Sequence, residues 1–454
     1  MTEVRTAVSG HDQVAARRAV EALRAGVPSR AAVAALGSAQ TEIEDRFAGL
    51  LEQAQDRSAG PRHPAGLLLG GGFGSGKSHL LEHLAQLALD AGFVVGRVVV
   101  SKETPLYDPV KVFRAAAASA VVPGGHGPAL VEAAASLDPG TPAHAELWRW
   151  VTSQGADLNE RFAATLLLFD RLGATDGELA DAIVRFWSGD PIKVAEVRRR
   201  LRETGEARYS LPAVAARELA RQRFRFATRL MVAAGYAGWL VLFDEVELIG
   251  RYSVLQRGRS YAELARWVRG AHDDPGLPLL AVLAMTDDFE AAVLSGKNDR
   301  EMVPSKLRSK QTLEYDEVAG LAEVGMRAID HETLLLAPPD DAELDRAYAR
   351  LKELHGEAFG WDPPDVAGLE RLGTTRMRQY VRAWINEWDL VRLDPEFAPQ
   401  TEVVDHALDS ATAYREDPDL EGTAPDRTSD SATAYREDPD LEGIAPDRTS
   451  DSAS

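Results

Sequence analysis

Residues 71–78 read Gly-Gly-Phe-Gly-Ser-Gly-Lys-Ser, a complete G-x-x-x-x-G-K-[ST] phosphate-binding loop. The loop follows the apolar run Leu67–Leu69 and precedes leucines at helical spacing, at positions 80, 81, 84 and 87. In this strand, loop and helix order, glycines let backbone N–H groups surround a phosphate, and the helix N-terminus adds its positive dipole end. The stretch therefore predicts a nucleoside triphosphate site rather than a glycine-rich turn that only reverses the chain.

Each part of this loop has an expected role. Lys77 should reach the β- and γ-phosphates, and the hydroxyl of Ser78 should bind Mg²⁺, so ATP and Mg²⁺ are the predicted cofactors. We expect the nucleotide to lie against the whole loop and the start of the following helix, which comprise Gly71, Gly72, Phe73, Gly74, Ser75, Gly76, Lys77, Ser78 and His79.

The second half of the site is predicted at residues 239–245, where the apolar run Trp239–Phe243 ends in Asp244 and Glu245. In this Walker B arrangement the first carboxylate holds Mg²⁺ and the second polarises the attacking water. Glu245 favours an ATPase, which converts ATP and water to ADP and phosphate, over a small-molecule kinase. The alternative is an acidic pair in a solvated loop.

A polar sensor is expected after a third apolar run, Leu279–Met285. This run ends at Thr286, the position at which ATPases of the additional-strand class place a residue between the Walker B carboxylates and the γ-phosphate. Thr286 could equally cap the next turn, because a threonine hydroxyl accepts local backbone hydrogen bonds.

A second sensor is expected near the C-terminal end, where Arg376 precedes the helical stretch Met377–Trp388. A guanidinium at the start of a lid helix could sense the γ-phosphate. The alternative is that Arg376 and Arg378 pair with acidic residues of the same helix on the surface, namely Glu387 or Asp389.

Length and composition limit which classes of protein this chain can belong to. The chain has 454 residues with 45% hydrophobic content, enough for a large core and more than one domain. No apolar run approaches the roughly 20 residues of a membrane span and the N-terminus has no signal-peptide core, so we expect a cytoplasmic protein without membrane contact. The absence of cysteine excludes disulfides, thiolate metal sites and cysteine nucleophiles.

The C-terminal region is the most acidic part of the chain. Residues 401–454 hold fifteen acids and four arginines, which account for −11 of the formal net charge of −20. A tandem repeat of 21 residues, Ser410–Asp430 and Ser431–Asp451, differs only at Thr423 and Ile444. Because such segments bury too little apolar surface to offset backbone entropy, residues 393–454 are predicted to be a disordered acidic tail.

The remaining segments are predicted to be helical. Residues 1–60 form an N-terminal helical segment in which Val33–Phe47 has helix-turn-helix spacing. Its second helix carries Glu42, Glu44 and Asp45, which would repel DNA phosphates, so a helical cap on the core is favoured.

Basic residues offer two candidate contacts with nucleic acid. Arg198–Arg200 with Arg202 could touch phosphates or form a solvated helix face. A second cluster mixes arginines 251, 257 and 259 with tyrosines 252 and 261. After Walker B, such a cluster could grip a strand by charge and stacking.

These observations predict an α/β fold of the P-loop NTPase class, AAA+ or ASCE-like, with a parallel sheet flanked by helices. The ATPase core should span residues 61–337, with a helical insertion at about residues 104–236. A C-terminal helical lid should span residues 338–392.

Three stretches together resemble the BREX-type ATP-binding proteins, BrxD-like members of the AAA+ class. They are the phosphate loop, Ser101–Pro109 (Ser-Lys-Glu-Thr-Pro-Leu-Tyr-Asp-Pro) and Asp244–Ile249 (Asp-Glu-Val-Glu-Leu-Ile). The resemblance extends over roughly residues 15–392 and leaves out the repeated tail. It implies a P-loop ATPase of bacterial phage-resistance gene clusters, often found beside a helicase, that acts on nucleic acid or on a partner enzyme.

Two functions remain open from the sequence. The first is ATP hydrolysis in a BREX-like antiviral defence system, acting on DNA or with a DNA-processing partner. The second is a nucleotide-dependent switch that docks a partner protein such as a helicase, with little DNA binding of its own. A homo-oligomer is a further possibility, for which Arg308 is the candidate arginine finger.

Overall fold

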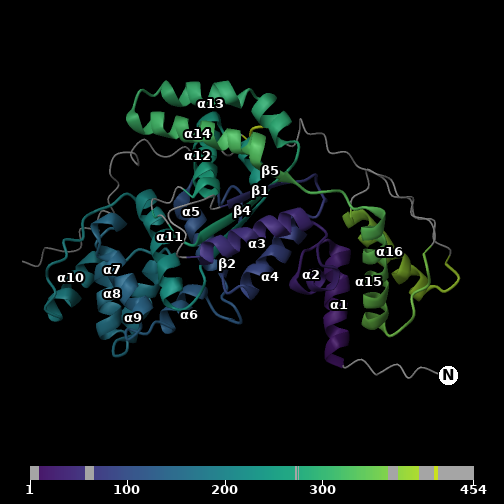
Figure 1. The fold of residues 1–454 in the computed structure, drawn as a ribbon, viewed down its shortest axis with the longest axis horizontal. Helices are drawn as coiled ribbons and strands as arrows, with labels where there is room; N and C mark the ends of the chain where they lie inside the picture. Colours follow the sequence, from purple (N-terminus) through teal and green to yellow (C-terminus); the bar gives the residue numbers. More distant parts are fainter. Residues whose placement is uncertain are drawn as a thin grey trace, which may run out of the picture.

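The computed structural model describes residues 10–56, 66–270, 274, 276–366, 377–397 and 414–417. Its centre is a five-stranded parallel sheet in the order β2-β3-β4-β1-β5 (Figure 1). The strands are β1 (Gly66–Gly70), β2 (Val94–Val99), β3 (Trp239–Asp244), β4 (Leu279–Met285) and β5 (Thr333–Leu335). The predicted α/β fold with a parallel sheet flanked by helices is confirmed.

Both faces of the sheet are covered, which explains why its strands are nearly continuous apolar runs. On one face, Leu240 and Val282 pack in a cluster with helices α3 (Thr41–Gln55) and α4 (Lys77–Asp90). On the other face, Val241 and Leu283 pack in a cluster that includes residues of α5 (Pro109–Ala118), α11 (Ala216–Ala233) and α12 (Val254–Arg269). Successive residues along a strand therefore pack against the helices on opposite faces of the sheet.

A helical region lies between β2 and β3, inside the predicted insertion. After α5 it contains α6 (Ala129–Ala135), α7 (Pro142–Val151), η1 (Gln154–Ala156), α8 (Arg161–Leu172), α9 (Gly177–Trp187) and α10 (Val194–Glu203), and α11 returns the chain to β3. Buried aromatic rings join these helices: Phe162 lies 4.9 Å from Phe226, and Trp187 lies 5.4 Å from the same ring, between centroids.

A helical layer also follows each of the next two strands. The short helix η2 (Val246–Arg251) and α12 follow β3, and η3 (Glu290–Ser295), α13 (Asp299–Arg308) and α14 (Leu313–Glu332) follow β4. Gly325 lets α14 approach α12 closely, because a Cβ atom there would lie 2.1 Å from the carbonyl oxygen of Tyr261. The α13–α14 hairpin projects at the top of Figure 1.

The N-terminal helices α1 (Gly10–Ala25) and α2 (Arg30–Leu36) pack with α15 (Asp341–Phe359) and α16 (Met377–Leu393). Their shared cluster includes Val20, Leu351 and Trp388. The helix α3, in contrast, buries Phe47 against α4 of the core. The predicted N-terminal segment is therefore divided: α3 packs on the core, and α1 and α2 pack with α15 and α16.

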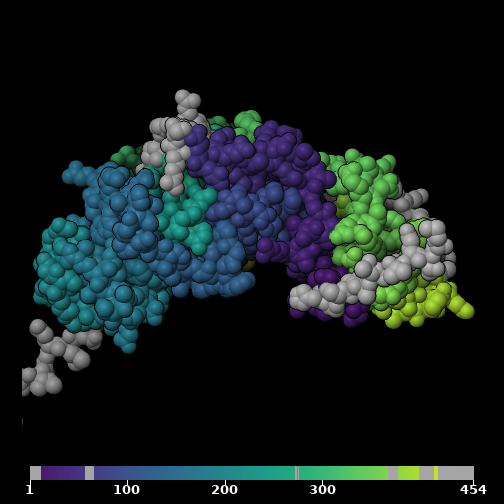
Figure 2. Space-filling model, turned by 60° about the horizontal axis from the view of Figure 1, so that its bottom comes forward, coloured from purple at the N-terminus to yellow at the C-terminus, as the bar shows by residue number. Residues whose placement is uncertain are grey.

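Figure 2 shows the molecule as an arch. The helical region between β2 and β3 forms one lobe, α1 with α15 and α16 forms the other, and the surface between them is concave. Among the described residues, none of the helices is both long enough and apolar enough to cross a membrane.

Most of the predicted tail lies outside the described residues. Residues 393–397, at the end of α16, and Tyr414–Asp417 are the exceptions, and Tyr414 is buried with only 6% of its surface exposed. The prediction of a disordered acidic tail is wrong at this residue, because its ring packs into the main core cluster.

Candidate functional site

The phosphate loop, Asp244, Glu245 and Thr286 lie at one edge of the sheet. In a parallel sheet all strands end at the same edge, where ligands of α/β proteins bind. The phosphate loop leaves β1, Asp244 ends β3, and Thr286 directly follows β4, which lies between them. The backbone N–H of Gly71 donates to the carbonyl of Met285 at 3.2 Å, which fixes the start of the loop beside the end of β4.

The loop has the backbone that only glycine adopts easily. Gly74 and Gly76 have φ values of +80° and +104°, and Gly76 immediately precedes α4. At Gly71 a Cβ atom would lie 2.5 Å from Ser75 Oγ. Lys77 is buried, and its Nζ donates to the carbonyls of Gly71 at 2.7 Å and Gly72 at 3.3 Å. The ammonium is therefore held inside the loop.

The two predicted Mg²⁺ ligands are in direct contact. Ser78 Oγ donates to Asp244 Oδ2 at 2.7 Å, and the other carboxylate oxygen, Oδ1, accepts from the N–H of Glu245 at 2.9 Å. Mg²⁺ is a hard cation that prefers oxygen ligands, such as those of hydroxyl and carboxylate groups. The residues present therefore fit the metal that the loop implies.

Glu245 adopts an unusual backbone conformation, with φ +58° in the left-handed region. Such strain in a non-glycine residue is concentrated at functional sites. Burial raises the pKa of Glu245 and the adjacent Asp244 raises it further, whereas Lys77 opposes the shift. A raised pKa makes this carboxylate a better proton acceptor once it is ionised.

Residues 13–128 match the family model described as BREX system ATP-binding protein BrxC/D. The BrxC/D match covers the phosphate loop, α4, β2 and Ser101–Pro109, so the resemblance in the sequence is confirmed there. Asp244, Glu245 and Thr286 lie beyond it. No curated protein and no solved structure matches the chain.

The stretch Ser101–Pro109, inside the BrxC/D match, packs against the segment that follows Walker B. The carbonyl of Ser101 accepts from the hydroxyl of Tyr252 at 3.1 Å, and the ring of Tyr107 lies 5.5 Å from that of Tyr252. Asp108 caps α5 by accepting from the N–H of Val110 at 3.0 Å. The two contacts of Tyr252 connect the matched segment with the chain that follows β3.

Glu247, to which the sequence assigns no role, lies near enough to Lys77, Asp244 and Glu245 to interact with their charges. It is 8% exposed, and within the described part of the chain its Oε2 has no hydrogen-bond partner. Burial raises its pKa to about 7, opposed mainly by a hydrogen bond to its own backbone and by Lys77. The available signal was an acid two residues after Glu245, in an otherwise apolar stretch.

Thr286 pairs with a residue far away in the sequence. Its hydroxyl forms a hydrogen bond with the hydroxyl of Tyr414, which also donates to Asp288 Oδ1 at 2.8 Å. The side chain of Thr286 is thus oriented by Tyr414.

The second sensor candidate, Arg376, lies outside the described residues. Its neighbour Arg378 donates to the carbonyl of Gly26 and so connects α16 with the end of α1. Asp389 pairs with Arg24 at 3.4 Å and with His355 at 3.2 Å. For Arg378, the structure therefore favours a structural contact different from the surface pair with Glu387 or Asp389.

Several other predicted residues have structural partners. His79 Nε2 is hydrogen-bonded to the carbonyl of Gly37 at 2.8 Å, which connects α4 with the end of α2. Arg308 on α13 is half exposed and pairs with Glu323 on α14 at 2.8 Å. In the predicted basic run, Arg199 and Arg200 pair with acidic residues of the helical region, as on a solvated helix face.

The hypothesis that the cluster after Walker B grips a nucleic acid strand is wrong for four of its five residues. Arg257, Arg259, Tyr252 and Tyr261 are all buried. Arg257 pairs with Asp299 at 2.8 Å, Tyr261 donates to the same carboxylate at 2.6 Å, and Arg259 donates to the hydroxyl of Tyr315 at 2.9 Å. The charges and rings form internal contacts.

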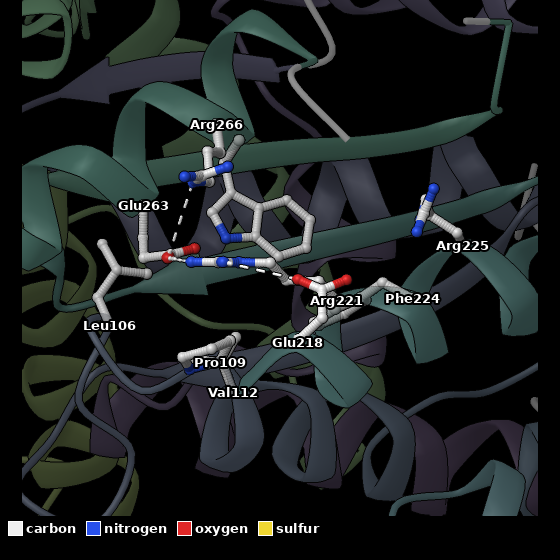
Figure 3. A pocket seen from close by; sticks show the side chains of 10 residues that line it. Leu106, Pro109, Val112, Glu218, Arg221, Phe224, Arg225, Glu263 and Arg266 are labelled. Carbon is white, nitrogen blue, oxygen red and sulfur yellow. Dashed lines mark hydrogen bonds and ion pairs between the residues drawn. The ribbon is translucent and has the colours of Figure 1, made fainter. Parts of the chain in front are cut away.

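A separate pocket lies between α5, α11 and α12 (Figure 3). Arg221 donates to Glu263 across it at 2.6 Å, and Phe224 and Trp267 supply apolar walls. It includes no residue of the phosphate loop or of Walker B. We therefore assign it no part in nucleotide binding.

Proposed function

We propose that this protein is an ATP-hydrolysing P-loop protein of the AAA+ type that acts in the cytoplasm in a BREX-like phage-defence system. The contact between Ser78 and Asp244, beside a phosphate loop that contains a buried lysine, carries the proposal. The strand order supports it, because β4 separates the loop strand from the Walker B strand. The BrxC/D match over residues 13–128 supports ATP as the nucleotide.

In this proposal, the loop amides and Lys77 hold the phosphates, while Ser78 and Asp244 hold the metal. Mg²⁺, when bound, would neutralise charge on the β- and γ-phosphate oxygens. Glu245 orients the attacking water and accepts its proton, a role that its raised pKa favours. Thr286 and Arg376 are assigned to sensing the γ-phosphate.

The target of the ATPase is a second part of the proposal. The burial of Arg257 and Tyr252 and the pairing of Arg199 with Glu196 weaken the sequence features that favoured DNA. This favours the alternative of a switch that docks a partner such as a helicase in one nucleotide state. A homo-oligomer is a further proposal, because Arg308 on α13 is half exposed and could reach the nucleotide site of a neighbouring copy.

The test is phosphate release by the purified protein, with and without single- and double-stranded DNA at low and moderate salt. Lys77→Ala is the inactive control. A DNA-stimulated rate that falls steeply with salt would support action on DNA. A slow rate that is indifferent to DNA would support the switch, and equal phosphate release by wild type and Lys77→Ala would reject the ATPase.

A further inference from the structure

The segment Tyr414–Asp417 occupies a fitted site on the core. The ring of Tyr414 packs edge-on against Phe289, with centroids 6.0 Å apart and planes at 84°. It also lies against Gly250, where an added Cβ would come within 2.8 Å of the Tyr414 ring. Only glycine at position 250 leaves room for this ring without movement.

The hydroxyl of Tyr414 makes polar contacts at the bottom of this site. Burial raises the pKa of Tyr414, so the hydroxyl stays protonated and donates to Asp288. Because a phenol has one proton, the bond with Thr286 must be donated by the threonine hydroxyl. The hydroxyl proton of Thr286, the proposed sensor, therefore points to the hydroxyl of Tyr414.

Two further contacts hold the segment. Glu416 Oε1 accepts from Arg257 Nη1 at 2.7 Å, and the side chain of Arg257 is only 3% exposed. The N–H of Asp417 donates to the carbonyl of Arg251 at 3.3 Å. Arg415, which lies between these residues, is exposed. A ring, a carboxylate and a backbone amide therefore anchor four consecutive residues.

The same four residues occur twice in the chain. Tyr-Arg-Glu-Asp at 414–417 lies in the first repeat, and the identical Tyr435–Asp438 lies at the same place in the second. The chain thus carries two copies of the ligand that this site accepts.

We propose that Gly250, Arg257, Thr286 and Asp288 form a binding site for the Tyr-Arg-Glu-Asp segment, that either repeat of the same chain can occupy it, and that occupation withdraws Thr286 from the nucleotide. The binding part stands on the contacts alone. The effect on the nucleotide rests on the proposed ATPase function.

The binding test uses the full chain with Tyr414→Ala alone and with Tyr414→Ala and Tyr435→Ala together. A fluorescent peptide with the sequence of residues 410–419 is titrated against each, and anisotropy is measured. The double variant should bind the peptide saturably. Wild type and the single variant should bind it at least roughly tenfold more weakly, because an attached segment competes at a high effective concentration.

Matched peptides separate this site from nonspecific binding. A peptide with alanine in place of Arg415 should bind like the original, whereas one with alanine in place of Tyr414 should bind poorly. The binding proposal is overturned if the double variant does not bind the original peptide, or if it binds the original and the two alanine-substituted peptides equally. If the double variant fails to fold, Glu416→Gln with Glu437→Gln leaves both tyrosines unchanged, and it should bind the peptide more tightly than wild type does.

The effect on the nucleotide is read from ATP turnover. The double variant should release phosphate roughly fivefold faster than wild type, the expected effect of freeing one hydrogen bond, and added peptide should reverse this. Peptide binding without any change in measurable turnover would overturn the regulatory part alone. If the protein binds the peptide but shows no ATP turnover, the proposed ATPase function is contradicted and the peptide-binding site is still supported.

Discussion

Ser78 and Asp244 are 166 positions apart in the sequence, and a 2.7 Å hydrogen bond joins their side chains. The contact depends on the sheet, because the loop after β1 and the end of β3 meet only where parallel strands share an edge. It brings together the hydroxyl and the carboxylate that we propose as Mg²⁺ ligands.

The first prediction concerns this pair. Ser78→Ala removes one proposed metal ligand, so half-maximal ATP turnover should require roughly tenfold or more Mg²⁺. Phosphate release measured across a Mg²⁺ titration tests this. Ser136→Ala, exposed at the C-terminal end of α6, is the control and should leave the titration unchanged. An unchanged midpoint in Ser78→Ala would remove this residue from the metal site.

The second prediction concerns Glu245, whose amide is fixed by Asp244 at 2.9 Å. Glu245→Gln keeps the shape of the side chain but cannot accept the proton, so turnover should fall at least roughly a hundredfold while ATP still binds. Phosphate release and equilibrium binding of a fluorescent ATP analogue separate the two effects. Glu203→Gln, on α10, should resemble wild type, and near-normal turnover by Glu245→Gln would contradict the assignment.

The third prediction concerns the buried pair of Arg257 and Asp299, whose side chains are 3% and 0% exposed. Arg257→Met leaves the Asp299 carboxylate buried without its cation, so the free energy of unfolding should fall by about 3–5 kcal/mol. Urea denaturation followed by circular dichroism measures the loss. Adding Asp299→Asn should restore part of the stability. If the single variant is as stable as wild type, the pair contributes nothing to the fold.

The sequence predicted where the candidate site residues lie relative to the sheet, because their positions are encoded locally. A glycine-rich loop follows one apolar strand and two acids lie at the end of another, and parallel strands end at the same edge of a sheet. Thr286 is placed by the same rule, since it directly follows a third apolar strand.

The contacts that the sequence did not predict are those between distant segments. Nothing near Arg257 in the sequence shows that Asp299 will neutralise it, so the sequence leaves open that these arginines and tyrosines grip a nucleic acid strand. Nothing near Tyr414 in the sequence shows that Gly250 leaves space for its ring, so the sequence predicts a disordered acidic tail there. The packing of α1 with α16 likewise depends on the two ends of the described fold meeting in space.

The fourth prediction concerns Glu247 and pH. Its pKa is about 7 in the folded protein, against an ordinary value of 4.5 in the unfolded chain, so the folded state binds this proton more tightly. The unfolding free energy should therefore fall as pH rises from about 4.5 through 7, by about 3 kcal/mol at most for a shift of this size.

Urea denaturation of wild type and Glu247→Gln at pH 5 and pH 8 tests this. The variant cannot ionise at position 247, so it should lose less stability than wild type between the two values. Its advantage should appear at pH 8, where the buried carboxylate of wild type is charged and its Oε2 has no partner among the described residues. Parallel pH profiles of the two proteins would mean that Glu247 is ionised in the fold with an ordinary pKa.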